Sequence, residues 1–396
     1  MTELSGEQFQ RLYACLALLI VGLSSFPLLP IDGLVFGQGE VIQAIYLVLM
    51  MGLTTASTGL AAIYTQWRAW DQINLCRRQN SVASVSTRRP CSERLHLVVV
   101  TLYREPLDLI TLTIRSLADQ PEASRMAVVV AIEESAPRRE ATIESIKNIF
   151  SHSFCHLLVF VHPKDLPGEI PGKCSNLNYA ARSAVAALES MSVDLRGATF
   201  TSCDADNIFG RNYFSALEDQ FACEAQGYSS LIWQATILYS WSPSSSPFFT
   251  AITGALRSVW ITGILVPFSI NGMSVFSMDL GLYRRGDYTS SAYQMEDILS
   301  VVRWSLITGK RVRVKPLPAA LLSGPTSGHN LWDHFDQWRQ QIRRWSIGAV
   351  EVFAYACCHI RASLLPWPQI IPWALWFLCI ILLFNASLHW LSVWDW

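Results

Sequence analysis

The sequence predicts an α/β fold in which helices cover both faces of a parallel sheet. Four apolar runs lie between residues 95 and 203, and segments with helical periodicity separate them. Strands that alternate with helices favour a parallel sheet, because each connection has to cross over the sheet. Acidic or polar residues also follow several of these runs directly. Ligands of such sheets bind beyond the carboxyl ends of the strands, so these residues indicate a site.

The predicted strands are apolar throughout rather than alternating, as expected for strands buried on both faces. They span residues 95–103 (LHLVVVTLY), 126–134 (MAVVVAIEE), 155–162 (CHLLVFVH) and 197–203 (GATFTSC). The clearest helical patterns between them span residues 108–120 and 175–191. All four strands would therefore end at one rim of the sheet.

The composition excludes several classes of protein. Charged residues make up 15% of the 396, whereas roughly 25% is usual, and the mean hydropathy is +0.27. The net charge of -1 and the absence of a basic tract argue against nucleic acid as a partner. The ten cysteines include no CxxC pair, so they indicate reduced thiols rather than a zinc site or a disulfide framework.

Three apolar segments are each long enough to cross a bilayer, which takes about 20 residues. They span residues 12–30, 41–64 and 370–394. Five arginines follow the second segment before Pro90, and basic loops stay on the cytosolic side. The sequence therefore predicts a multi-pass integral membrane protein whose middle part faces the cytosol, in the plasma membrane or in the ER or Golgi membranes.

Two acids, Asp204 and Asp206, directly follow the fourth predicted strand. In extended backbone, residues two apart point to the same face, so their carboxylates repel each other unless a cation lies between them. Paired carboxylates favour a hard cation such as Mg²⁺ or Mn²⁺, whose shell substrate phosphates complete. An EF-hand is excluded, because Ile208 occupies the fifth position of such a loop.

Other motifs accompany the acid pair. Glycines and Lys173 precede the helix of residues 175–191, an arrangement that suits a diphosphate. Further along lie Glu296-Asp297, at the start of an apolar run, and the string QIRRW from Gln341 to Trp345. The acids at 296 and 297 also suit a helix N-terminus, which the helix dipole favours without any catalytic role.

TLYREP, GKCSNLN, DAD, MED and QIRRW, in this order, resemble the membrane-bound family-2 glycosyltransferases. Cellulose, chitin and hyaluronan synthases and ceramide glucosyltransferase belong to this superfamily, and LPGEIPGKCSNLNYAAR resembles a less characterised eukaryotic branch of it. The resemblance covers residues 95–350. It implies a GT-A fold, a Rossmann-like mixed and mostly parallel sheet, flanked by transmembrane helices. The implied domains are a transmembrane hairpin (1–70), a basic cytosolic linker (71–94), the GT-A domain (95–350) and a C-terminal interfacial segment with a transmembrane helix (351–396).

The resemblance also implies roles for individual residues. Asp297 would be the general base, with Glu296 beside it, and Trp345 would stack on the acceptor sugar. Asp204 and Asp206 would hold Mg²⁺ or Mn²⁺. The donor and its nucleotide would contact Tyr103, Glu105, Glu133, Lys173, Asp204, Gln341 and Arg344. The family usually has Asp near the uracil and ribose where this chain has Glu133 or Glu134, and Met295 replaces the Thr of the processive members' Thr-Glu-Asp motif.

The predicted function is therefore transfer of a sugar from a UDP-sugar to a lipid or a growing polysaccharide by a membrane-embedded inverting enzyme. Polymer synthases usually need six or more helices for a channel, so three helices favour a lipid acceptor or a pore shared within a homo-oligomer, with membrane lipids as further partners. A HAD-like phosphatase also begins with a strand followed by DxD. It would need a second acid after Gly286-Asp287, and residues 288–291 supply none. A non-catalytic membrane scaffold is the remaining alternative, and it would not require these motifs together.

Overall fold

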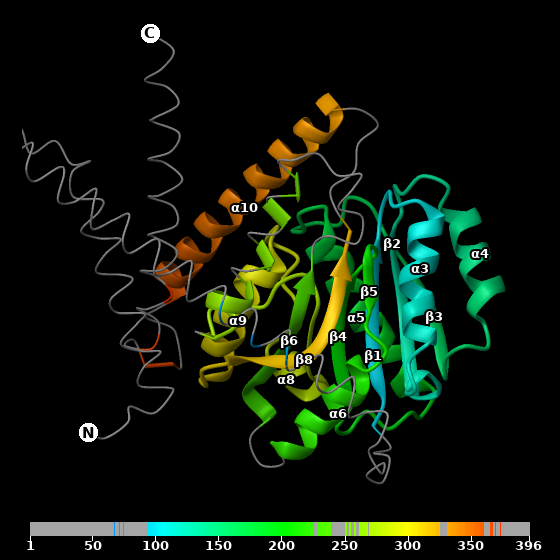
Figure 1. Ribbon diagram of the computed structural model, residues 1–396, viewed down its shortest axis with the longest axis horizontal. Coiled ribbons are helices and arrows are strands. Elements are labelled where there is room, and N and C mark those ends of the chain that lie inside the picture. Colours follow the sequence, from blue (N-terminus) through cyan, green and yellow to red (C-terminus); the bar gives the residue numbers. More distant parts are fainter. Residues whose placement is uncertain are drawn as a thin grey trace, which may run out of the picture.

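The computed structural model describes residues 94–224, 228–238, 261–267, 269–324 and 331–359. It also describes the isolated positions 67, 71, 74, 250, 251, 253, 254, 257, 258, 365, 366, 369 and 373. Within these ranges the chain forms one mixed sheet of eight strands with helices packed against it (Figure 1). The predicted α/β class is therefore confirmed.

The first half of the sheet matches the four predicted strands. Its elements are β1 (His96–Leu102), α3 (Leu107–Ala118), β2 (Met126–Glu133), α4 (Arg139–Phe150), β3 (His156–His162), α5 (Lys173–Ser190) and β4 (Thr199–Asp204), with a single 3-10 turn at Ala123–Arg125. The strands pair in parallel in the order β3-β2-β1-β4. Because β2 and β3 lie on one side of β1 and β4 on the other, the direction of winding reverses between β1 and β4. Parallel α/β sheets bind ligands beyond the strand ends at such a reversal.

The second half continues the sheet with shorter and partly antiparallel strands. It contains β5 (Asn207–Phe209), α6 (Tyr213–Cys223), β6 (Leu231–Leu238), β7 (Phe276–Asp279), α8 (Leu280–Arg285), α9 (Glu296–Thr308), β8 (Arg313–Ser323) and α10 (Leu331–His359), with single turns at Tyr228–Ser230 and Ile261–Leu265. β7 joins the two halves, because it pairs antiparallel with both β4 and β6. Four of the seven strand pairings described are parallel, as the mixed and mostly parallel prediction requires.

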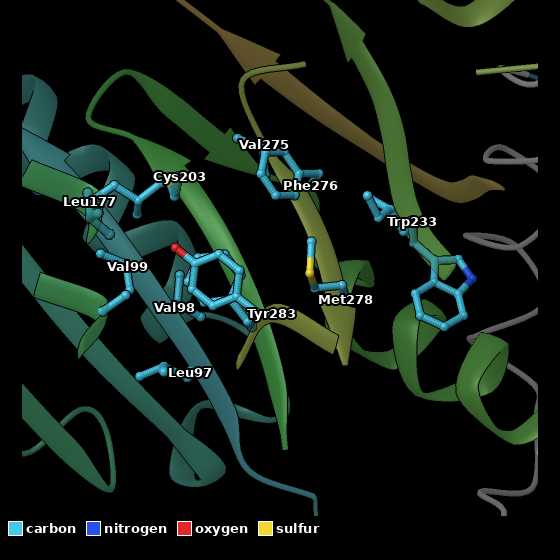
Figure 2. Packing of buried hydrophobic residues seen from close by; sticks show 14 of the residues in the cluster. Leu97, Val98, Val99, Leu177, Cys203, Trp233, Val275, Phe276, Met278 and Tyr283 are labelled. Carbon is cyan, nitrogen blue, oxygen red and sulfur yellow. The ribbon is translucent and has the colours of Figure 1, made fainter. Parts of the chain in front are cut away.

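The strands hold their places because side chains on both faces are buried. All seven residues of β1 are buried, and α5 packs across β1, β2 and β3. Figure 2 shows Val98 of β1, Cys203 of β4 and Met278 of β7 among the buried side chains of this core. Tyr283 of α8 stacks on Phe200 of β4, with ring centroids 3.7 Å apart, and its hydroxyl hydrogen-bonds Thr289. These contacts hold α8 against the first part of β4 and connect it to the loop that leads to α9.

The predicted localisation as a multi-pass membrane protein is contradicted. In the part of the chain that the structure describes, none of the helices combines the length and the apolar character needed to cross a bilayer. α10 has 29 residues, but its first half carries several charged side chains. The predicted spans 12–30 and 41–64 lie outside the described residues, and only Trp373 is described within 370–394.

Gly286 provides a test of this packing. A Cβ atom at this position would lie 2.3 Å from Cδ1 of the buried Trp304 ring. We expect Gly286→Ala to lower the free energy of unfolding by about 1–3 kcal/mol, because the ring has to move within a dense core. Chemical denaturation would measure the change, and Asn148→Ala, at an exposed position of α4, is the control. An unchanged stability for Gly286→Ala would contradict the tight contact.

Candidate active site

Most of the predicted site residues gather at the rim where β1, β2 and β4 end. Asp204 is the last residue of β4 and pairs in register with Thr101, two residues before Tyr103. Glu133 is the last residue of β2. Lys173 begins α5 and Glu296 begins α9, so two helix N-termini face the same rim. Residues separated by nearly 200 positions are thereby brought together.

Lys173 lies at the centre of this arrangement. Its ammonium is 2.7 Å from Oδ1 of Asp204 and forms a second ion pair with Glu296. It also donates to the carbonyl oxygen of Ser274 at 3.4 Å. Burial by itself lowers the pKa of Lys173, but Asp204, Glu296 and Asp297 outweigh it and hold that pKa well above its ordinary value. The lysine is therefore a permanent cation that joins β4 to α9.

Glu296 and Asp297 are both buried, although they begin a helix. Burial raises the pKa of Glu296 to about 7, with Lys173 opposing the rise and Asp297 adding to it. Burial likewise raises the pKa of Asp297, against the effects of Lys173 and of the Ser274 N–H. That N–H donates to Oδ2 of Asp297 at 3.3 Å, and the N–H of Ile298 donates to Oδ1 at 2.9 Å. A fixed carboxylate with a raised pKa has the properties that a general base needs.

Asp204 and Asp206 are the two acids that the end of β4 and the turn after it bring to the site. The pKa of Asp206 rises to about 7, because the carboxyl is buried and because Asp204 and Glu105 place negative charge near it. Such an excess of negative charge fits a divalent cation, and Mg²⁺ is commonly held by one or two carboxylates plus substrate phosphates. Within the described ranges no three His, Cys, Asp or Glu side chains are arranged to hold a metal. The pair therefore fits a cation that a phosphate ligand shares, and not a closed metal cage.

Tyr103 and Glu105 form the outer part of the rim. Tyr103 is 41% exposed, and its backbone N–H donates to Glu105 at 2.7 Å. The guanidinium of Arg104 lies over the Tyr103 ring, 4.8 Å from its centroid. Tyr103 therefore lies at the exposed edge of the site, and Glu105 adds to the negative charge around Asp206.

Glu133 belongs to a cluster that the sequence did not indicate. His162 pairs with Glu133 in the register of β2 and β3, and its Nδ1 lies 3.2 Å from the Glu133 carboxylate. Its Nε2 lies 2.8 Å from Glu169, in the loop before Lys173. Burial raises the pKa of Glu133, and His162 opposes that rise. His162 thus ties the end of β2 to the glycine-rich loop, and only the strand register could have predicted this contact.

The predicted QIRRW motif lies on α10, beyond its first two turns. Gln341 is half-buried and Arg343 is exposed. The backbone at positions 344 and 345 is helical, and the side chains of Arg344 and Trp345 lie outside the described part of the structure. α10 runs along α9, so the motif belongs to a helix that packs beside the one carrying Asp297 (Figure 1).

Comparison with known proteins gives matches among solved structures only. No family model and no curated protein matches the sequence. The mannosyltransferase PcManGT of Pyrobaculum calidifontis, solved with GDP-Man and Mn²⁺, is 16% identical with a TM-score of 0.49, over 83% of this chain and 86% of that one. TarS 1-349 of S. aureus is 14% identical with a TM-score of 0.35, over 58% of this chain and 60% of that one. GalNAc-T7, solved with UDP, GalNAc and Mn²⁺, is 10% identical with a TM-score of 0.38, over 62% and 47%.

The raised pKa of Asp206 predicts how its carboxyl affects stability. Between pH 3.8, its ordinary pKa, and about pH 7, the folded chain keeps a proton that the unfolded chain has released. Asp206 therefore lowers the free energy of unfolding as the pH rises through this window, by at most about 1.4 kcal/mol per pH unit. We expect Asp206→Asn to remove this part of the slope in denaturation curves taken from pH 4 to pH 8.

Asp219→Asn, at an exposed position of α6, is the matched control and should keep the wild-type slope. If Asp206→Asn also keeps the wild-type slope, then Asp206 does not hold a proton in the folded chain at these pH values.

Proposed function

We propose that this protein is an inverting glycosyltransferase that moves a sugar from a UDP-sugar to a hydroxyl group of a lipid or a growing polysaccharide. The domain that would do so is the predicted GT-A domain of residues 95–350. One observation carries the proposal: Lys173 pairs at once with Asp204, at the acidic end of β4, and with Glu296, beside Asp297. Groups suited to neutralise a leaving diphosphate and a group suited to accept a proton therefore belong to one connected site.

The reaction needs these groups on opposite sides of one carbon atom. The oxygen of the acceptor hydroxyl would attack the anomeric carbon while the bond from that carbon to the diphosphate oxygen breaks. Asp297 would take the proton of the hydroxyl, and the electron pair of the broken bond would leave with the diphosphate. Two hydrogen bonds hold Asp297 in place for this task, donated by the backbone N–H groups of Ser274 and Ile298 to its carboxylate.

Lys173 and the acids of β4 would hold the donor. A divalent cation bound by Asp204 and Asp206 would neutralise charge on the diphosphate, a form of help that is often the largest contribution to such catalysis. Lys173 would keep its ion pair with Glu296 and turn its ammonium from Asp204 to the diphosphate. Tyr103 and Glu105 would contact the nucleotide.

Glu133 would contact the nucleotide from the end of β2, in an orientation that His162 restricts. On the acceptor side, Gln341, Arg344 and Trp345 of α10 would close over the diphosphate and offer a flat ring to the acceptor sugar. Trp345 suits a sugar acceptor, and either a single transfer to a lipid or repeated transfer to a polymer fits this arrangement.

Asp297→Asn tests the base. We expect the rate of sugar transfer to fall about 10²–10⁴-fold, because the amide cannot accept the proton, while the KM for the donor changes little. The transfer of radiolabelled sugar from a panel of UDP-sugars would be measured, with Asp219→Asn as the control. Because burial raises the pKa of Asp297, wild-type activity should also fall as the pH is lowered through that raised pKa. Full activity of Asp297→Asn would refute the assignment.

Removal of divalent cations tests the donor site. We expect a chelator to abolish transfer and either Mn²⁺ or Mg²⁺ to restore it, and Asp204→Ala to prevent that restoration. The same samples would be assayed for phosphate release from phosphate esters. Release of phosphate without any sugar transfer would support the phosphatase alternative instead. The absence of both activities would support a non-catalytic scaffold.

A further inference from the structure

Residues 293–295, just before Glu296 and Asp297, contact α10, and of these only the Met295 carbonyl, which accepts from the Leu299 N–H at 3.2 Å, is bonded within α9. Met295 is the N-cap of α9, but no side chain caps this helix end with a hydrogen bond. A helix start without such a bond is less firmly fixed, since a good N-cap contributes about 1 kcal/mol. The position of Asp297, two residues later, therefore depends on what else holds residues 293–295.

Three consecutive residues contact α10. The Tyr293 and Tyr355 rings meet edge to face, with centroids 5.7 Å apart. The backbone N–H of Gln294 donates to both carboxylate oxygens of Glu351, at 3.2 and 3.3 Å. The third contact involves Gly348.

Gly348 is buried against Met295. A Cβ atom on Gly348 would lie 2.5 Å from Cγ and 2.8 Å from Cβ of Met295. No real Cβ comes so close, so this glycine allows α10 to approach the N-cap of α9 at a distance that any larger residue would prevent.

The contacting residues of α10 form a single stripe along the helix. Positions 348, 351 and 355 follow each other at intervals of three and four, so they share one face of the helix. Gln341 lies seven residues before Gly348, so the same periodicity brings it to this stripe. The distance from Gln341 to Gly348 along the helix axis is about 10 Å.

We propose that Gly348, Glu351 and Tyr355 are positioning residues that clamp residues 293–295 and so set where Asp297 stands relative to the acceptor-binding part of α10. This inference rests on the proposed function, in which Asp297 and α10 act on the same acceptor. The contacts of the three residues are with residues 293–295, so they would act through the backbone that precedes Asp297. A displacement of about 1 Å in such a group can reduce a rate about 100-fold.

The experiment compares full-length variants that loosen and restore the clamp. Gly348→Ala would push Met295 away, and the double variant Gly348→Ala/Met295→Gly would make room again for the added methyl group. Glu351→Ala would remove the acceptor of the Gln294 N–H, whereas Glu351→Gln would keep an oxygen there. Cys357→Ser, at an exposed position of α10, is the control.

Two readouts are needed, kcat with both KM values, and hydrogen–deuterium exchange of peptides that cover residues 290–298. We expect Gly348→Ala and Glu351→Ala to lower kcat about tenfold or more, with the donor KM within about threefold of wild type. Both should also speed exchange in this segment. The double variant and Glu351→Gln should recover most of kcat and of the slow exchange, and Cys357→Ser should match the wild type.

The outcomes separate the clamp from the proposed function. Unchanged kcat and exchange in Gly348→Ala and Glu351→Ala would overturn the clamp, as would a double variant that recovers neither. A fall in kcat matched by an equal rise in the donor KM would also overturn it, because a displaced base should leave the binding of the donor unchanged. If the wild type transfers no sugar at all, the proposed function fails, and the exchange measurements alone decide whether the clamp exists.

Discussion

The site depends on one partly buried cation held among carboxylates. Lys173, at the start of α5, pairs with Asp204 at the end of β4 and with Glu296 at the start of α9. Burying several acids together is unfavourable, and removing the partner of a buried charge typically costs about 3–5 kcal/mol. The lysine therefore allows the two acidic segments to approach each other. When a substrate draws the ammonium of Lys173 away from Asp204, positive charge, such as a divalent cation, has to take its place beside the acids.

The winding of the sheet explains why these groups meet. β1 and β4 are neighbours, but β2, β3 and α5 come between them in the chain. α5 therefore begins near the carboxyl end of β4, and its first residue, Lys173, lies beside Asp204. β7 continues the sheet from β4. Ser274, just before β7, donates its N–H to Asp297 at the start of α9. α10 completes the site from the side, where Gly348 lets it pack closely against the N-cap of α9.

Sequence patterns predicted the first half of the fold well and the second half poorly. β1 to β4, α3 and α5 were predictable, because their apolar runs and helical periods are long and uninterrupted. β7 has only four residues, and β8 contains Pro316 and Pro318, which normally argue against a strand. The membrane localisation was predicted partly from a high apolar content. Strands buried on both faces need such content without any lipid, as the fully buried β1 illustrates.

The candidate site was predictable only where a motif is local. Asp204, Asp206, Glu296 and Asp297 stood out as pairs of acids beside predicted strands or helices. The contacts of His162 with Glu133 and Glu169 depend on strand register. The hydrogen bond from the Ser274 N–H to Asp297 depends on the left-handed backbone of Ser274, with φ of 51°, in an irregular loop. Neither leaves a signal in the sequence. The ion pair of Lys173 with Glu296 joins residues 123 positions apart, so it too required the fold.

We propose that the acids of β4 and the ammonium of Lys173 together bind a cation and a diphosphate. Crystals soaked with Mn²⁺ and a nucleoside diphosphate, and measured at a wavelength where manganese scatters anomalously, would test this. We expect one strong anomalous peak within about 2–2.5 Å of carboxylate oxygens of Asp204 or Asp206, with the diphosphate between the metal and Lys173. A metal and diphosphate bound elsewhere, or no ordered metal at these acids, would contradict the account.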